Sequence, residues 1–449
     1  MTILDENIQA AGDVLIEKLL MVSSSGKVIS LLDYLVELNI KESIFSPGIN
    51  GELILADANN LVKEFPIIGE EILIVSIRTP TLKSAIQKAF RIYAVVDRNY
   101  TEGASAQVYI LEFCSIEVMR DIVNPVYGSF SGNAKDIVEQ IYNDYLRIPT
   151  SKNTLNITNN PGKIDIDFGN TNILLARSSN KIKFVSPGWN PVKCINWVCS
   201  KSEAENNKAC NFLFWGTTKS FYFSNLNSIF ENAAKISAGK YYYTTALVNS
   251  ATDVSAQMSS IKSLSIKKNI NQLTNKIEGY LSSRLVDVDI HNKTYLNYDY
   301  DHTERFFNYA HTAGPQKSLP LFDVTTANNP LTYIRTHFYD SKLHTDFNDN
   351  FNERYKYVYG NRRSNLLELD NFSMRIVIPG RTDIEAGGII EIQLPKTFPV
   401  YTEDSKTDQN IDETYSGYYL ITSLNHKINK LTHFITMDVA KDSLPAKNN

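Results

Sequence analysis

The chain has 449 residues, of which 43% are hydrophobic and 21% are charged, and this ordinary globular composition excludes a largely disordered protein. Its formal net charge is -4, so it has no excess of basic residues to neutralise a phosphate backbone, and we expect no direct nucleic-acid binding. No stretch stays apolar over the roughly 18 residues that a membrane-spanning helix needs.

Residues 1–25 are predicted to form an N-terminal extension. Leu15 and Leu19 fall on one face of a short amphipathic helix, which is followed by a serine-rich turn. Asp5 and Glu6 stand where a signal peptide carries basic residues. We therefore expect the chain to be made and folded in a reducing cytoplasm.

Residues 26–118 are almost all strand and predict one barrel or sandwich. The segment Ile72–Ile77 is apolar on both faces, as in a strand that is buried on both sides. Phe90–Asp97 and Gln107–Ser115 predict a hairpin, since Asn, Glu and Gly residues occupy the loop between them.

Residues 119–199 predict an α+β domain. The helix expected at Ala134–Tyr145 has apolar residues along one face. A second helix should begin with Asn190 as its N-cap and Pro191 in the first helical position.

The remaining chain divides into strand-rich parts and a polar insert. A hairpin is predicted from Phe212–Trp215 and Phe221–Phe223, and a second one from Tyr418–Ile428 and Leu431–Val439. Residues 246–363 are polar and weakly periodic, which predicts an inserted region with light packing.

The first and last strand-rich regions resemble each other in layout. Gly69–Glu112 and Gly387–Asp438 each contain a strand start, a Tyr-bearing strand, a loop and a third strand. Two copies of one barrel in a single chain would explain this echo. The alternative is that any two antiparallel barrels share such a pattern.

Several motifs suggest chemistry but lack an essential residue. In Gly128–Gly132 a phenylalanine occupies the place of a nucleophilic serine, so we predict a loop and helix start there. Asp346, Asn348 and Asn350 have the spacing of a calcium loop, but Phe351 replaces the required glycine. A solvated loop is the better interpretation.

Histidines and cysteines give no ligand pattern either. His302 and His311 lie in the polar insert, and His426 and His433 could face each other across the final hairpin without a carboxylate partner. The cysteines lack the close pair of a zinc site and are predicted to be buried thiols: Cys114, Cys194, Cys199 and Cys210. Gly387 and Gly388 precede a strand, so they offer phosphates no helix terminus. We therefore expect no catalytic, cofactor-binding or metal-binding residues, no cofactor and no enzymatic activity.

Four stretches in their order and spacing carry a family resemblance: Gly51–Glu70, Ser115–Tyr145, Pro187–Phe223 and Ile378–Ile421 with the final hairpin. Together they resemble the baseplate central hub protein of contractile-tailed bacteriophages of the T-even type. More distantly, they resemble the hub part of bacterial contractile secretion spikes.

The resemblance implies a mainly β fold with α+β parts, in which two tube-like antiparallel barrels accompany a small α/β domain and an inserted region. The first barrel would span 26–118. The second would be discontinuous, built from 200–245 and 364–445 with 246–363 inserted into it.

The resemblance also implies a structural virion protein of the tail baseplate, assembled in the host cytoplasm. A homotrimeric ring would connect the tail tube to the central spike and adapt six-fold to three-fold symmetry. The implied partners are the central spike protein, the tail tube and tape-measure proteins, and baseplate wedge proteins. Any spike or lysozyme activity is expected on another chain.

Two other functions are consistent with parts of the sequence. A β-rich receptor-binding or glycan-binding tail protein would use its 25 Tyr and 3 Trp to stack on sugars. A cell-wall hydrolase would need paired carboxylates in a cleft, which cannot be placed in this sequence.

Overall fold

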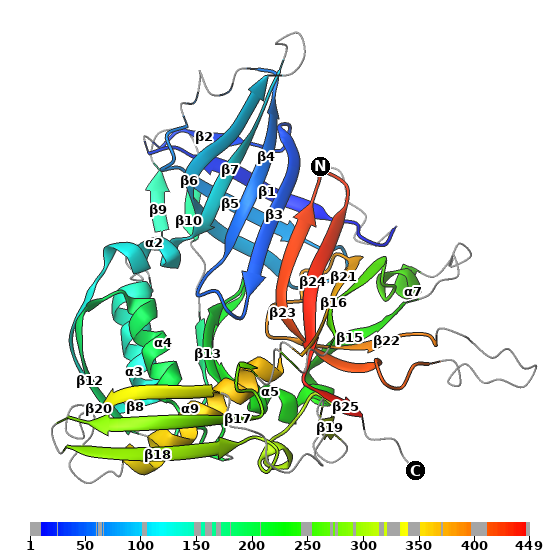
Figure 1. Ribbon diagram of the computed structural model, residues 1–449. Coiled ribbons are helices and arrows are strands. Elements are labelled where there is room, and N and C mark those ends of the chain that lie inside the picture. The colour runs from blue at the N-terminus through cyan, green and yellow to red at the C-terminus, as the bar shows by residue number, and fades with distance from the viewer. Residues whose placement is uncertain are drawn as a thin grey trace, which may run out of the picture.

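A computed structural model gives the fold of the chain (Figure 1). It describes residues 10–445 except 25, 60, 62–64, 66, 101–105, 148–153, 158–163, 168–171, 180, 207, 244–253, 270–272, 274–276, 291–292, 314–317, 321–332, 340–350, 370 and 397–410.

A 13-stranded sheet runs through the protein, with strand order β16-β21-β24-β23-β3-β4-β7-β6-β5-β1-β2 and with β22 and β15 beside β23. Its N-terminal half contains β1 (Leu15–Val22), β2 (Val28–Ser30), β3 (Leu35–Ser43), β4 (Asn50–Asp57), β5 (Ile72–Arg78), β6 (Ala85–Tyr100) and β7 (Gln107–Ser115). Its C-terminal half contains β15 (Ser237–Tyr242), β16 (Ser263–Asn269), β21 (Phe372–Pro379), β22 (Ile389–Gln393), β23 (Gly417–Ile428) and β24 (His433–Lys441). The predicted mainly β fold class with α+β parts is confirmed.

Each half of the sheet packs around a core of its own. Leu38, Leu53 and Leu111 belong to the N-terminal core, whereas Ile376 and Met437 belong to the C-terminal core. The inward residues alternate along the strands, as expected of antiparallel strands with one buried face. The two hairpins predicted in these regions are confirmed, as β6–β7 and β23–β24.

The short helix predicted within residues 1–25 is wrong. Residues Leu15–Val22 form β1, which pairs antiparallel with β5. Leu19 and Met21 point into the N-terminal core with no exposed surface. An apolar segment this short is compatible with the periodicity of a helix and with that of a strand. It forms a strand here because it pairs with the edge of β5.

Helices and small sheets lie below and beside the N-terminal half (Figure 1). The helices are α2 (Ile116–Val123), α3 (Ala134–Ile141), the π-helix η1 (Tyr142–Leu146), α4 (Pro191–Lys201), α5 (Leu226–Glu231) and α6 (Ala233–Ile236). The strands are β8 (Val126–Asn133), β9 (Thr154–Ile157), β10 (Ile164–Asp167), β11 (Asn172–Leu175), β12 (Lys181–Trp189), β13 (Phe212–Gly216) and β14 (Ser220–Asn225). Both predicted helices and the β13–β14 hairpin are confirmed.

The insert is more ordered than its composition indicates. Its described elements are α7 (Val254–Met258), β17 (Ser282–Asp289), β18 (Thr294–Asp301), the 3-10 helix η3 (Phe306–Asn308), β19 (Ser318–Pro320), β20 (Tyr333–Tyr339) and α9 (Phe351–Glu368); β25 (Ser443–Pro445) pairs with β19. Tyr280 and Phe306 form a small core there. Residues 263–269, predicted to lie in the insert, instead form β16 of the large sheet.

No helix in the described part of the chain is both long enough and apolar enough to cross a membrane.

Candidate assembly site

The two halves of the large sheet have the same strand order. It is β1-β5-β6-β7-β4-β3 in the N-terminal half and β15-β22-β23-β24-β21-β16 in the C-terminal half. With β2 left out, each strand also has the same rank along the chain as its counterpart. One pairing differs in direction, because β15 runs parallel to β22 whereas β1 runs antiparallel to β5.

Local details also repeat between the two halves. The register shifts directly after Ile92 in β6 and directly after Ile421 in β23. The backbone N–H of Ile92 donates to the carbonyl of Glu71, and the N–H of Ile421 donates to that of Gly388, both over 2.9 Å. A β-bulge is a specific local feature, so its repetition supports duplication of one sheet in preference to chance likeness.

These matches define two rows of facing residues. In the N-terminal half, Ile92, Phe113, Gly51 and Ile40 face one another in turn across β6, β7, β4 and β3. In the C-terminal half, Ile421, Val439, Met374 and Ile266 face one another across β23, β24, β21 and β16. Ile40 therefore corresponds to Ile266.

The halves join where β23 changes its neighbour. Its first residues pair with β22, up to Leu420, and its later residues pair with β3 from Ser423 to Ile428. In this junction His426 faces Ile40. One continuous sheet results, although the two joined strands are separated by most of the chain.

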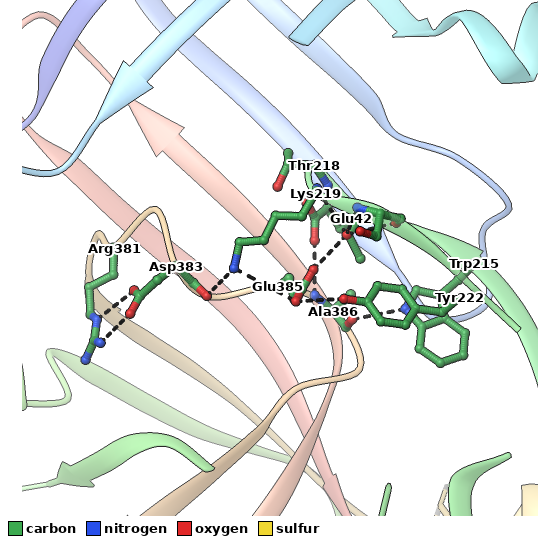
Figure 2. Close-up of polar contacts among 11 residues, drawn as sticks. Glu42, Trp215, Thr218, Lys219, Tyr222, Arg381, Asp383, Glu385 and Ala386 are labelled. Carbon is green, nitrogen blue, oxygen red and sulfur yellow. Dashed lines mark hydrogen bonds and ion pairs between the residues drawn. The ribbon is translucent and has the colours of Figure 1, made fainter. Parts of the chain in front are cut away.

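A buried carboxylate connects three parts of the molecule at this junction (Figure 2). Glu42 lies at the end of β3 and is almost fully buried. It accepts a hydrogen bond of 2.6 Å from the N–H of Thr218 in the β13–β14 turn. It accepts another of 3.0 Å from the N–H of Ala386, just before β22. Each of the two N–H groups would otherwise lack a partner, so Glu42 couples the N-terminal sheet to the hairpin and to the C-terminal half.

Glu385 makes the second set of contacts at this junction. Its carboxylate accepts hydrogen bonds from the hydroxyls of Tyr222, at 2.9 Å, and Thr217, at 2.8 Å. Lys219 lies 3.9 Å from the same carboxylate and donates to the carbonyl of Asp383 over 2.6 Å. Figure 2 shows these side chains converging between the hairpin and the segment before β22.

The segment before β22 is shaped by Trp215. The indole N–H donates to the carbonyl of Ala386 over 3.1 Å. Gly387 has φ of +87°, and a Cβ there would lie 2.7 Å from the indole ring. A glycine is required on both grounds. As predicted, Gly387 and Gly388 precede a strand.

Burial sets the protonation behaviour of this site. It raises the pKa of Glu42 to about 7, against the two backbone N–H bonds, which lower it. Burial and the neighbouring Glu385 also raise the pKa of Tyr222. Glu42 accepts from the backbone N–H groups of Thr218 and Ala386, and Tyr222 donates to Glu385, so the arrangement suits holding these parts of the chain together.

Two histidines lie next to this junction. His426 Nδ1 and His433 Nε2 are 3.0 Å apart, which confirms that the pair faces across the β23–β24 hairpin. Burial lowers the pKa of His426 to about 3 and that of His433 well below its usual range. Both rings are therefore neutral at physiological pH, and one donates to the other.

His311, Glu368 and Asp442 form a buried cluster that has the residue types of a metal site. His311 Nδ1 lies 2.9 Å from Asp442 and Nε2 lies 2.8 Å from the carbonyl of Phe306. Burial would lower the pKa of His311, but Asp442 outweighs it and raises the pKa to about 9. In this arrangement both ring nitrogens of His311 have hydrogen-bond acceptors, and the protonated ring forms an ion pair with Asp442.

The other candidate motifs have structural explanations or lie outside the described residues. Gly128–Gly132 lies within strand β8, and α3 follows it, so the predicted loop is wrong and the helix start is right. Asp346, Asn348 and Asn350 lie outside the described residues. All four cysteines are buried and free, as predicted.

Sequence reasoning missed Glu42 as a functional residue. Leu38, Ile40 and Glu42 occupy successive inward positions of β3. The sequence signal that could have identified Glu42 was therefore an acidic residue at a position where the alternating pattern of β3 places apolar residues. Its partners could not be found from the sequence, since Thr218 and Ala386 are far away along the chain.

The sequence matches no protein-family profile and no curated protein. Among solved structures, the chain is similar to a tail protein from Neisseria meningitidis MC58, with 10% identity, TM-score 0.51 and coverage of 96% of each chain. It is also similar to the 43 kDa tail protein of prophage MuSo2 from Shewanella oneidensis, with 10% identity, TM-score 0.52 and coverage of 95% of this chain and 98% of the other. The chain therefore has the fold of these tail proteins, in agreement with the resemblance in its sequence.

Proposed function

We propose that this chain is a structural protein of a phage tail baseplate and acts as its central hub. Three copies close into a ring that connects the tail tube to the central spike. The ring is assembled in the host cytoplasm and becomes part of the virion. It does its work by binding other proteins and without catalysis.

The duplicated sheet is the observation that carries this proposal. Three chains with two similar sheets each present six similar sheets around one axis, while the remaining parts of the chains occur three times. Such a ring fits a six-fold partner on one side and a three-fold partner on the other. Closed cyclic assembly also covers strand edges that would otherwise invite aggregation.

The proposed partners follow from this position. The tail tube and tape-measure proteins contact the six-fold side, the central spike contacts the three-fold side, and wedge proteins surround the ring. The fold shared with two tail proteins, one of them from a prophage, over nearly the whole chain supports the assignment.

Sedimentation and electron microscopy of the purified chain over a wide concentration range test this proposal. We expect a monomer–trimer equilibrium and ring-shaped trimers with a central channel and six sheet lobes. Rings of six chains, or a chain that stays monomeric at every concentration, would refute it. Clear hits on a glycan array with a monomeric chain would favour the sugar-binding tail protein.

A further inference from the structure

The free edges of the large sheet lie at positions that match the internal junction. Inside the chain, β23 presents one side to β22 and then, further along, to β3. In the other half, β6 pairs with β5 up to Arg91. Among the described strands nothing pairs with that side of β6 from Tyr93 to Tyr100; β10 approaches β6 but pairs with β9.

The counterpart of β3 is also unpaired. β16 pairs with β21 on one side, and no other described strand pairs with it. In Figure 1, β16 lies on the opposite side of the sheet from β6. Among the described strands, the free edge of β6 thus corresponds to the edge that β23 presents to β3. The free edge of β16 corresponds to the edge that β3 presents to β23.

Apolar residues that are buried at the internal junction have counterparts that are exposed at the free edges. Ile40 of β3 is 0% exposed, whereas its counterpart Ile266 of β16 is 49% exposed. Leu424 of β23 is 3% exposed, whereas its counterpart Val95 of β6 is 38% exposed. Apolar residues that the internal junction buries are thus left in solvent at both free edges.

We propose that β16 of a second copy of this chain pairs antiparallel with the free edge of β6, repeating the internal junction between subunits. The inference rests on the proposed function, and it specifies the interface. In the internal junction Asn425 faces Lys41. The register of β16 shifts after Ile266, so Lys268, which pairs with Ser373 as Lys41 pairs with Asn50, is the counterpart of Lys41. Carried over through the matching rows, the internal register places Val96 of one subunit opposite Lys268 of the next.

The two kinds of junction differ in how firmly they are held. Glu42 and the β13–β14 turn hold the internal junction. The position in β16 that corresponds to Glu42 is Asn269, and each chain has a single β13–β14 hairpin, which is already used. The junction between subunits therefore lacks this reinforcement and is the one that opens when the ring dissociates.

Disulfide trapping of the full chain tests the interface. The variant carries Val96→Cys and Lys268→Cys, and the matched control carries Val96→Cys and Ser263→Cys. Lys268 pairs with Ser373, and Ser263 pairs with Val377, four positions further along β21. At about 3.3 Å per residue the control pair therefore stands about 13 Å out of register, beyond the reach of a disulfide. The native thiols are buried and serve as an internal background. Mild oxidation is followed by non-reducing electrophoresis, with sedimentation of the same samples.

A ladder of covalent dimers and trimers that stops at three, formed by the variant and not by the control, supports the proposal. Trimers in sedimentation without cross-links in the variant overturn the interface and leave the proposed function standing. A ladder that continues beyond three supports the edge pairing and overturns the three-fold ring. Absence of both trimers and cross-links overturns both proposals.

Discussion

Replacing Glu42 by Gln should shift stability in favour of the variant, relative to the wild type, as the pH rises from below 4.5 to above 7. Burial raises the pKa of this carboxyl from 4.5 to about 7 in the folded protein. The folded state therefore binds the proton more tightly than the unfolded chain does. The corresponding stability is fully present below pH 4.5 and is lost as the pH rises to about 7.

The size of the effect follows from the two pKa values. Each pKa unit corresponds to about 1.4 kcal/mol, so the wild type loses about 3 kcal/mol of stability from this group across that interval. Glutamine is neutral at every pH and occupies nearly the same volume, but only its carbonyl oxygen accepts, so the N–H of Thr218 or of Ala386 loses its acceptor at every pH. The free energy of unfolding of Glu42→Gln, measured against that of the wild type, should therefore rise by about 3 kcal/mol from below pH 4.5 to above pH 7.

Urea unfolding below pH 4.5 and above pH 7 measures this difference. Trp215 is a local fluorescent reporter, because its indole N–H donates to the carbonyl of Ala386, whose N–H donates to Glu42. Replacing Trp189 and Trp197 by Phe in both proteins isolates its signal. The matched control is Glu52→Gln on the neighbouring strand, which is partly exposed and should change stability by less than about 1 kcal/mol.

A stability difference that shifts in favour of the wild type as the pH rises past 7 would refute this reasoning. That result would mean that the N–H groups of Thr218 and Ala386 stabilise the carboxylate by more than burial penalises it. The folded-state pKa would then lie below 4.5, and the junction would hold an anion.

Three further predictions concern other buried polar groups. The pKa of His311 is raised to about 9, so its contribution to the free energy of unfolding is present below pH 6.5 and is lost as the pH rises to about 9. The stability advantage of the wild type over His311→Asn, measured by urea titration, should therefore shrink by about 3 kcal/mol across that interval. The pKa of His426 is lowered to about 3, so the wild type should lose up to about 5 kcal/mol of stability as the pH falls from 6.5. His426→Phe should therefore unfold less steeply in acid, which circular dichroism can follow. Equal acid transitions for the two proteins would contradict this. Arg362 of α9 donates to the carbonyls of Cys199, Cys210 and Phe212, so Arg362→Met should cost about 3 kcal/mol and make the insert the first region cut in limited proteolysis, whereas unchanged cleavage would show that this contact does not hold the insert.

Local elements were predictable because their signals are local. The helix at α4 begins where Asn190 and Pro191 predict it, and the β23–β24 hairpin follows from apolar residues at alternate positions. The echo between Gly69–Glu112 and Gly387–Asp438 was visible for the same reason. Each copy keeps the strand pattern that its half of the sheet requires.

The tertiary structure decided the pairings and the assembly site. Leu15–Val22 forms a strand because it pairs with the edge of β5. Residues 263–269 belong to the large sheet because they pair with the edge of β21. Ser43 faces Ser423 at the junction. Local sequence patterns do not show which of the many strand edges pair when they are so far apart along the chain. The sequence by itself determined elements such as α4 and the β23–β24 hairpin, and it showed the duplication as a repeated pattern, since these signals depend on periodicity within a few residues. The fold alone brought Glu42 to its partners and left the edges of β6 and β16 free, because strand edges are completed by backbone groups that every residue carries.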